Sequence, residues 1–551
     1  MRAKSVLYAY CLLIAALLLA TSSGCWKKPE LQTVNPTRYL DVKEDQQEEL
    51  WELIRIKNEV VGYRNTVIER FSEEGKTVYQ VTQETMIADN RLGNRVSGSI
   101  MTIVQQKRDG TFLLGDKYES LSGQPMVTRF RPDEESDNMI RWASAVMIDQ
   151  ASGEETTGTD PSIKKLPWKT GTSGEFGVLF SLWEKPLTPG EKRIFEYFDM
   201  TLEQLVTVEL VAGKIEPLLY NNAETYLLPV AETTRIGKTV LTSHLWMDAG
   251  GSIVKAAMTD PYPMEITLST REKAKSAFAN AGKLNLSLFA LVRVQGTIPQ
   301  PRTTQKVELR LHWVNQNAQN ASATPFATLF PETAFQSVSV VDGNTLTMTV
   351  TASTPQALSA LYGSVIPPTP KETTVPGDVQ RNEWVQSDSD TIKTLADEAT
   401  DRKNPIWEVA ADLERFVSQK MRRVSYQQSF ASAAEVAETL QGDSAGYAVL
   451  LAAVARAKNI PSRVVVGLVY TETNMSEGVF VPHFWTELYI DGHWHPFDAT
   501  ITRTTGQGGA DASRIVLARS NLADESLPSL AAKTLPLIGH LQVTVVTTMG
   551  D

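Results

Sequence analysis

The stretch from Gly442 to Thr500 decides how this chain folds. It opens as Gly442-Asp443-Ser444-Ala445-Gly446-Tyr447 and continues through an apolar segment to Ile460-Pro461-Ser462-Arg463. It then carries His483-Phe484-Trp485 and closes with Pro496-Phe497-Asp498-Ala499-Thr500. Small, polar and titratable residues thus stand at the borders of three apolar runs, which is typical of a site assembled between secondary-structure elements.

The first apolar run has the spacing of a helix. Its small and apolar residues recur every three or four positions, at Ala445, Ala448, Leu451, Ala452 and Ala455. Pro461 lies just beyond the run, where a helix normally ends. Ser444 is therefore expected at the N-terminus of a buried helix, and Asp443 is expected to cap it.

The later runs have the pattern of strands. Residues 463–470 are rich in valine, and residues 484–490 and 494–497 flank Asp491-Gly492, which is a strong two-residue hairpin signal. A hairpin at this turn places His483 and Asp498 on adjacent antiparallel strands. The helix N-terminus, His483 and Asp498 can therefore converge.

This order of parts resembles the transglutaminase-like superfamily, which shares the papain-like arrangement of a helix-borne nucleophile facing a sheet that carries His and Asp. The matching positions are Gly442, Ile460-Pro461-x-Arg463, Gly467, His483-x-Trp485-x-Glu487 and Trp494 through Asp498-x-Thr500. The resemblance covers residues 390–551. It departs from the family at one position, because Ser444 stands where the family has its nucleophilic cysteine.

The resemblance implies acyl transfer or amide hydrolysis through a covalent acyl-enzyme. A thiol beside a helix N-terminus and a protonated histidine ionises near neutral pH, whereas a serine hydroxyl does not. Ser444 could act only if His483 removed its proton during attack while Asp498 fixed the imidazole. Backbone N–H groups around Ser444 and Ala445 would then bind the oxyanion.

Two functions are consistent with these residues. The loss of the thiol favours a non-catalytic or weakly active binding or scaffold protein of the cell envelope, whose partner would be a protein or a cell-wall peptide. The alternative is a serine-dependent acyl transferase or amide (peptide) hydrolase with Ser444, His483 and Asp498 as its candidate catalytic residues. The sequence predicts no cofactor for either function.

A zinc site is the third arrangement to weigh. His493 and His495 lie two residues apart on one expected strand and so share a face, with His483 on the neighbouring strand. No cysteine and no Glu-x-x-His helix accompanies them. We therefore interpret them as hairpin residues and predict no metal.

Composition excludes one class of partner. The chain has 551 residues, is 42% hydrophobic and carries a formal net charge of −11 without a long basic run. It is ordinary globular material with enough length for several domains. Nucleic acid is not expected as a partner, because phosphate binding needs a basic surface.

The N-terminus reads as an export signal. Arg2 and Lys4 precede an apolar stretch at 6–20, and small residues follow before Cys25. Ser23-Gly24-Cys25 resembles the end of a bacterial lipobox, although Ser22 stands where leucine is preferred. We expect a lipid on Cys25 that anchors the protein to the membrane, on the periplasmic side of the bacterial cell envelope. An ordinary cleaved signal and an uncleaved anchor remain open.

The predicted fold class is α+β, with antiparallel β-rich N-terminal domains followed by a papain-like C-terminal domain. The division runs as follows: a signal peptide at 1–24, a tether at 25–50, a β-rich region of one or two sheets at 51–287, a small β domain at 288–362, a Pro-rich linker at 363–389 and the transglutaminase-like domain at 390–551.

Overall fold

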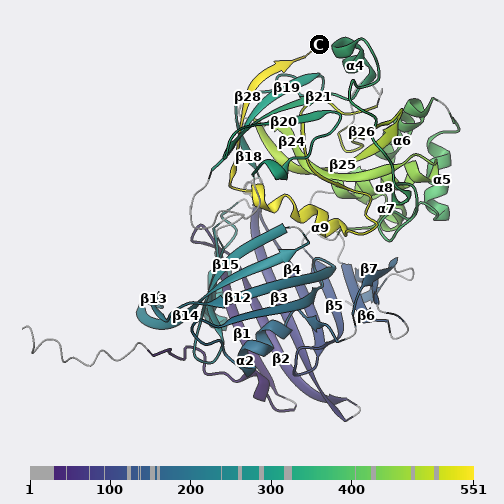
Figure 1. The fold of residues 1–551 in the computed structure, drawn as a ribbon. Helices are drawn as coiled ribbons and strands as arrows, with labels where there is room; N and C mark the ends of the chain where they lie inside the picture. The colour runs from purple at the N-terminus through teal and green to yellow at the C-terminus, as the bar shows by residue number, and fades with distance from the viewer. Residues whose placement is uncertain are drawn as a thin grey trace, which may run out of the picture.

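The computed structural model has two stacked parts, a large N-terminal sheet and a C-terminal α+β part (Figure 1), which confirms the predicted fold class. The structure describes residues 30–550 apart from 45, 74, 92–93, 121–125, 134–135, 137, 149–154, 158–161, 170, 238, 259–262, 285–290, 315–325, 404, 424–429, 473–477 and 502–507. The expected signal peptide and Cys25 lie outside the described residues.

The N-terminal part is one continuous sheet rather than two. Within the described residues it has 17 strands, with these bounds: β1 (Gln47–Ile56), β2 (Glu59–Glu73), β3 (Lys76–Arg91), β4 (Asn94–Gln106), β5 (Phe112–Ser120), β6 (Met126–Pro132), β7 (Asn138–Ile148), β8 (Glu155–Thr157), β9 (Ser162–Pro167), β10 (Ser173–Gly174), β11 (Lys192–Asp199), β12 (Gln204–Ala212), β13 (Glu216–Tyr220), β14 (Ala223–Ile236), β15 (Thr239–Met247), β16 (Ile253–Met258) and β17 (Met264–Ser269).

Two sets of strand pairings close this sheet on itself. β1 pairs with both β2 and β17, so the first strand joins the two halves of the region. The short β10 pairs with β11 on one side, and on the other Gly174 N donates to Gly110 O and Phe112 N donates to Thr172 O, at the start of β5. We call the result the closed sheet. Helix α2 (Gly177–Glu184) follows β10 and packs its Phe180 against Tyr79 of β3.

Helix α3 (Arg271–Ala279) covers the outer face of the closed sheet. The side chain of Thr270 caps it by accepting a hydrogen bond from Lys273 N. Its buried Ala274 lies in a cluster with Trp51, Leu53 and Tyr63 of β1 and β2. These side chains alternate with inward-facing ones along each strand, as the two-residue period of a strand requires.

The C-terminal part is built on a second sheet, which within the described residues has nine strands in the order β20-β21-β19-β28-β18-β25-β24-β27, with β26 paired to β25. Their bounds are β18 (Val292–Gln295), β19 (Lys306–Trp313), β20 (Gln336–Asp342), β21 (Thr345–Thr351), β24 (Ser462–Glu472), β25 (Gly478–Ile490), β26 (His493–Phe497), β27 (Arg514–Ser520) and β28 (Leu541–Met549).

Helices cover this sheet. They are α4 (Pro355–Tyr362), α5 (Asp390–Ala399), α6 (Ile406–Lys420), α7 (Ala433–Thr439), α8 (Ser444–Ala457) and α9 (Leu527–Ala532). Single turns occur at η1 (Tyr39–Asp41), η3 (Phe326–Leu329), η4 (Pro376–Asp378) and η5 (Leu535–Leu537), and β22 (Arg422–Arg423) pairs with β23 (Gln441–Gly442). Within the described ranges every helix is too short or too polar to cross a bilayer.

The structure differs from the prediction of a separate β domain at 288–362. β19 pairs along its length with β28, and β18 pairs with both β25 and β28. Residues 292–357 also share a hydrophobic cluster with residues 468–543. The strands of this segment are therefore part of the sheet that carries His483. The sequence predicts β structure in this segment, but a strand pattern does not specify which other strand each edge strand will pair with.

The Pro-rich segment at 363–389 also differs from a free linker. Asp378 is fully buried and forms an ion pair with Arg463 of β24 at 3.3 Å. Trp384 and Val385 are buried in the core that surrounds α8. Proline fixes the backbone without preventing side chains from packing. This segment therefore packs against the C-terminal part and does not act as a free linker.

The predicted tether at 25–50 packs against the closed sheet at several of its described residues. Tyr39, Leu40 and Val42 are buried in a core of the closed sheet. Val34 N and Asn35 N both donate to Asp248 Oδ2, at 3.0 and 2.8 Å. Since β1 begins at Gln47, residues 30–50 belong to the closed sheet.

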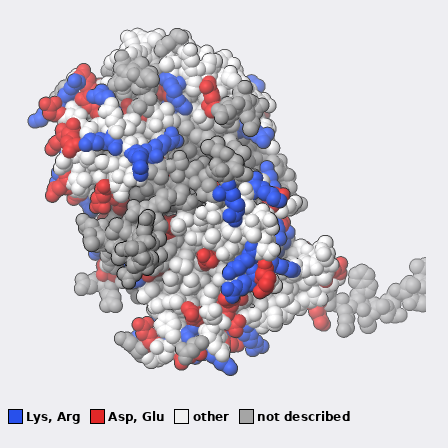
Figure 2. Space-filling model, turned by 180° about the vertical axis from the view of Figure 1, so that it is seen from behind, with Lys and Arg blue, Asp and Glu red and all other residues white. Residues whose placement is uncertain are grey.

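The two parts meet along α9 (Figure 1). Ala532 of α9 joins a hydrophobic cluster of the closed sheet, and Ser526 Oγ donates to Leu202 O at 3.2 Å. A buried ion-pair group adds to this junction: Arg141 of β7 contacts Glu203 at 2.6 Å and Glu435 of α7 at 3.3 Å. On the face seen in Figure 2, acidic and basic side chains are interspersed.

Candidate functional site

Ser444 begins α8, as the sequence predicts. This helix is rich in alanine and is buried on nearly all sides, so it packs closely against its neighbours. Asp443 is its N-cap, since its Oδ1 accepts hydrogen bonds from Ala445 N at 2.9 Å and Gly446 N at 3.3 Å. The Ser444 side chain is partly exposed, and its Oγ accepts a hydrogen bond from Phe484 N at 3.3 Å.

The hairpin β25–β26 brings His483 next to Asp498. Asp491 and Gly492 both have positive φ, 52° and 95°, as a tight two-residue hairpin turn requires. His483 Nε2 lies 2.9 Å from Asp498 Oδ2, and both side chains are buried. Asp498 therefore holds Nε2, and Nδ1 is the ring nitrogen left for a nucleophile.

Asp498 is held by more than His483. Arg514 donates to the same Oδ2 at 3.0 Å, and Thr500 N and Ile501 N donate to Oδ1 at 3.0 and 3.3 Å. Burial would raise the pKa of Asp498, but the charges and hydrogen bonds of His483 and Arg514 outweigh it and hold that pKa well below its usual range. The carboxylate stays ionised and fixes the imidazole.

Three charged residues of this network have no place in the predicted motif. Arg514 also contacts Asp511 at 2.6 Å, and Asp498 N donates to Glu414 Oε1 at 2.7 Å. The sequence contained a signal for Glu414. It is a charged residue one turn after Ala410 on the apolar face of α6, where it is buried, and a charge on an apolar face indicates a buried partner. Arg514 and Asp511 gave no such signal.

At the start of α8, the groups that catalysis would need already form other hydrogen bonds, unlike the His483–Asp498 pair. The N–H group of Ala445, which an oxyanion would need, is already bound to Asp443. Burial raises the pKa of Asp443 more than its hydrogen bonds and His483 lower it. Among the described residues no hydrogen bond joins Ser444 to His483. The histidine is positioned as a base, but the serine is held by a backbone group instead.

The other two histidines of the hairpin have structural partners. His493 Nε2 lies 3.0 Å from Thr369 O, and His495 packs between Phe335 and Trp407 with ring centroids 5.1 Å from each. Burial and His493 lower the pKa of His495 to about 3. The described residues contain no group of three or more potential ligands that could hold a metal ion.

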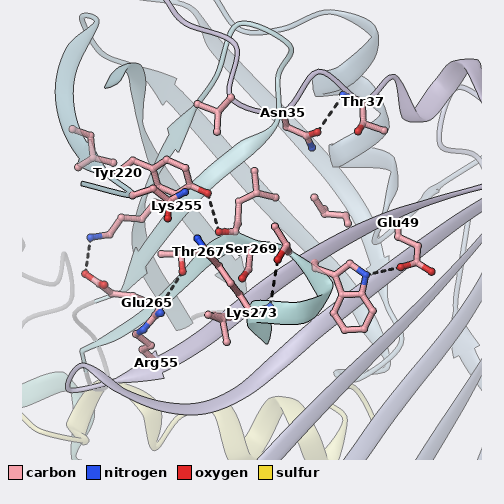
Figure 3. A pocket seen from close by; sticks show the side chains of 18 of the residues that line it. Asn35, Thr37, Glu49, Arg55, Tyr220, Lys255, Glu265, Thr267, Ser269 and Lys273 are labelled. Carbon is pink, nitrogen blue, oxygen red and sulfur yellow. Dashed lines mark hydrogen bonds and ion pairs between the residues drawn. The ribbon is translucent and has the colours of Figure 1, made fainter. Parts of the chain in front are cut away.

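Cavities occur in the closed sheet, away from Ser444. One of about 680 Å³ lies on the outer face between β1, β17, β13 and the start of α3 (Figure 3). Of its basic side chains, Lys255 pairs with Glu265 at 2.6 Å and Arg55 donates to Thr267 at 2.8 Å. A second cavity, of about 310 Å³, lies inside the closed sheet, lined by residues of β1 to β3, β11, β12, β14 to β17 and α2.

A family model matches the part of the chain that carries the site. The model of the transglutaminase-like superfamily matches residues 393–499, which include Ser444, His483 and Asp498. No sequence among the curated proteins matches the chain.

The solved structures that are similar to the chain include the following three. A cysteine protease candidate from Cytophaga hutchinsonii is 15% identical, with 45% of this chain and 86% of that chain covered and a TM-score of 0.24. A β-barrel-like protein of a domain family of unknown function from Brucella abortus is 12% identical, covering 42% and 98%, with a TM-score of 0.29. A protease candidate from Parabacteroides distasonis is 11% identical, covering 84% and 71%, with a TM-score of 0.18.

Proposed function

Because residues 393–499 belong to the transglutaminase-like superfamily, we propose that this chain is a cell-envelope protein whose transglutaminase-like domain binds a protein or a cell-wall peptide with little or no turnover. Serine in place of the family's cysteine is the observation that carries this proposal. A hydroxyl cannot supply the preformed thiolate on which a papain-like site depends.

The hydrogen bonds around Ser444 support low activity. Its Oγ accepts from Phe484 N, and the Ala445 N–H group that would stabilise an oxyanion is engaged with Asp443. Removal of one oxyanion donor typically costs a factor of 10² to 10³ in kcat, or about 3 to 4 kcal/mol. A site with a weak nucleophile and an occupied donor is better suited to binding than to acyl transfer.

One observation favours the alternative of a serine-dependent acyl transferase or amide hydrolase. The His483–Asp498 hydrogen bond is buried, at 2.9 Å, and Arg514 supports it. This is the arrangement that a general base needs, with its tautomer fixed by a carboxylate. If His483 deprotonates Ser444 when a substrate binds, Ser444, His483 and Asp498 form a working triad.

A substitution at the nucleophile position tests whether the site is assembled. Ser444→Cys should create a thiol that reacts with iodoacetamide at pH 7 at least tenfold faster than a model peptide thiol, because α8 and His483 favour the thiolate. His483→Ala in the same background should return the rate to that of the model thiol. A slow reaction with iodoacetamide whose rate does not change in His483→Ala would show that the site is not assembled.

The wild-type protein decides between the two functions. A fluorophosphonate probe reacts with activated serines, so the binding proposal expects no labelling of Ser444. Labelling that disappears in both Ser444→Ala and His483→Ala would establish the serine nucleophile and overturn the binding proposal.

The proposed location follows from the N-terminal succession of basic, apolar and small residues before Cys25. We expect incorporation of a labelled fatty acid into the wild-type protein and none into Cys25→Ser. Incorporation that survives this substitution, or that never occurs, would contradict lipid anchoring. Acylation would hold the closed sheet close to the membrane, where it is proposed to position the transglutaminase-like domain.

A further inference from the structure

The hairpin of β13 and β14 ends in an apolar tip that is only partly covered. Its turn is Asn221-Asn222, where φ is positive at both residues, 48° and 64°, as a two-residue hairpin turn requires. The four residues before the turn, 217–220, are Pro-Leu-Leu-Tyr, of which two are exposed and two half-buried. Leu219 is 75% exposed. A run of four apolar residues that reaches the surface in this way normally has a function.

The tip projects from the closed sheet but is held in place. β14 pairs with β15 only from Leu228 onward, so residues 223–227 pair with β13 alone among the described strands. Tyr220 Oη donates to Leu268 O of β17 at 2.9 Å, which holds the tip over the outer face of the sheet. The hairpin, β1, β17 and α3 together surround the cavity of about 680 Å³ (Figure 3). Leu219 therefore lies at the rim of this cavity.

Basic side chains lie across the same cavity from the tip. Helix α3 carries Arg271, Lys273 and Lys275, all exposed, and one acidic residue, Glu272. Lys273 lines the cavity and forms no ion pair with a described residue. Lys275 lies 5.5 Å from the ring centroid of Trp51, another residue of the cavity wall. Since the whole chain has a net charge of −11, this basic surface is a local feature.

The N-terminal segment lies against the same hairpin. Gln32 N donates to Tyr226 O at 3.0 Å and Tyr226 N donates to Gln32 Oε1 at 3.1 Å, so the segment contacts β14 next to the tip (Figure 1). Asn35 then lines the cavity. Cys25 comes five residues before Glu30, the first described residue, and five residues span at most about 18 Å even when extended. A lipid on Cys25 would therefore hold this side of the closed sheet next to the bilayer.

We propose that the hairpin tip and the exposed face of α3 dock onto a bilayer that contains anionic phospholipid, with Leu219 inserted at the interface and Lys273 and Lys275 against the lipid phosphates. We call this surface the docking face. An apolar side chain is stabilised by leaving water, and basic side chains are attracted to anionic headgroups. The choice of a membrane as the partner rests on the proposed lipid anchor at Cys25. Anchor and docking face would lie on the same side of the molecule, so each would favour the binding of the other.

Vesicle co-sedimentation tests the docking face without the lipid anchor. A chain of residues 25–551 with Cys25→Ser lacks the expected signal peptide and contains every described residue. It should sediment with phosphatidylglycerol vesicles and bind phosphatidylcholine vesicles at least fivefold more weakly. Binding to phosphatidylglycerol should fall as the salt concentration rises, because salt screens exposed charges. Equal binding to the two kinds of vesicle, or binding to neither, would overturn the proposal.

Matched variants locate the contact. Leu219→Asp and Lys273→Glu should each lower the affinity for phosphatidylglycerol vesicles at least fivefold, and both side chains are exposed, so the fold should be retained. Val341→Asp and Lys393→Glu are the controls, because these exposed residues lie on β20 and α5 in the C-terminal part. Equal losses in the controls, or no loss in the two variants of the docking face, would show that the vesicles bind elsewhere.

Fatty-acid incorporation at Cys25 is a separate measurement, so the anchor and the docking face can fail independently. Incorporation without vesicle binding would overturn the docking face and leave the anchor. Vesicle binding without incorporation would support the docking face and overturn the anchor. Self-association that Leu219→Asp abolishes, in a chain that does not bind vesicles, would assign the tip to a second copy of this chain.

Discussion

Glu175 is a residue whose negative charge the fold disfavours. Its pKa rises from 4.5 to about 8 because of burial and Asp199. A carboxyl group whose pKa is higher in the folded chain loses stability on ionisation. The cost is absent below the unfolded pKa and grows as the pH rises toward the folded pKa. Glu175→Gln should therefore increase the free energy of unfolding at pH 8 by on the order of 2 kcal/mol and leave it nearly unchanged at pH 4.

Urea denaturation at the two pH values measures this difference. Glu196→Gln serves as the control and should alter stability at neither pH, since Glu196 lies on β11 with an exposed side chain. If Glu175→Gln were less stable than the wild type at pH 8, the carboxylate would have a stabilising partner in the folded protein.

At the scale of elements, the N-terminus of α8 combines a cap with a negative charge. Asp443 accepts two backbone hydrogen bonds there. Asp443→Ala should lower the free energy of unfolding by about 1 kcal/mol through the lost cap, whereas Asp443→Asn keeps the acceptor and should stay close to the wild type. Thermal or urea denaturation of the pair checks this order.

In the Ser444→Cys background, Asp443→Ala and Asp443→Asn distinguish the effect of the Asp443 charge on the thiol from the effect of its cap. Both substitutions remove negative charge beside the sulfur, so both should raise the iodoacetamide rate at pH 7. An increase with alanine alone would mean that the freed Ala445 N–H group matters and the charge does not. A decrease with both would contradict the role of Asp443 as an unfavourable neighbour of the nucleophile.

The whole molecule is divided differently from its sequence pattern, and a pair of fragments tests this. A fragment of residues 291–551 contains every strand of the second sheet, whereas a fragment of residues 364–551 lacks β18, β19, β20 and β21. The shorter fragment exposes half of a shared hydrophobic cluster and leaves β28 without its partners.

We expect a cooperative thermal transition, followed by circular dichroism, for residues 291–551 and none for residues 364–551. Hydrophobic burial of this extent is the main favourable contribution to folding, so its loss should not be tolerated. Cooperative unfolding of the shorter fragment would restore the sequence-based division at residue 363.

Local signals were sufficient for the parts of the candidate site. The three- and four-residue spacing specified α8, Asp443 was identified as its cap, and Asp491-Gly492 specified the hairpin that carries His483 toward Asp498. Each of these depends on neighbouring residues only, so the chain itself contains the information.

What the sequence determined by itself is therefore the elements of the candidate site, their order and the resemblance of residues 393–499 to the transglutaminase-like superfamily. Tertiary structure alone decided which strands pair beyond the predicted hairpin and which charges meet outside the predicted motif. Arg514 reaches Asp498 from β27, Arg141 reaches Glu435 across the junction, and two residues of β10 complete the closed sheet. The reason is physical: helices and hairpins form from contacts close in the chain, whereas pairing across hundreds of residues depends on the packing of all the elements together.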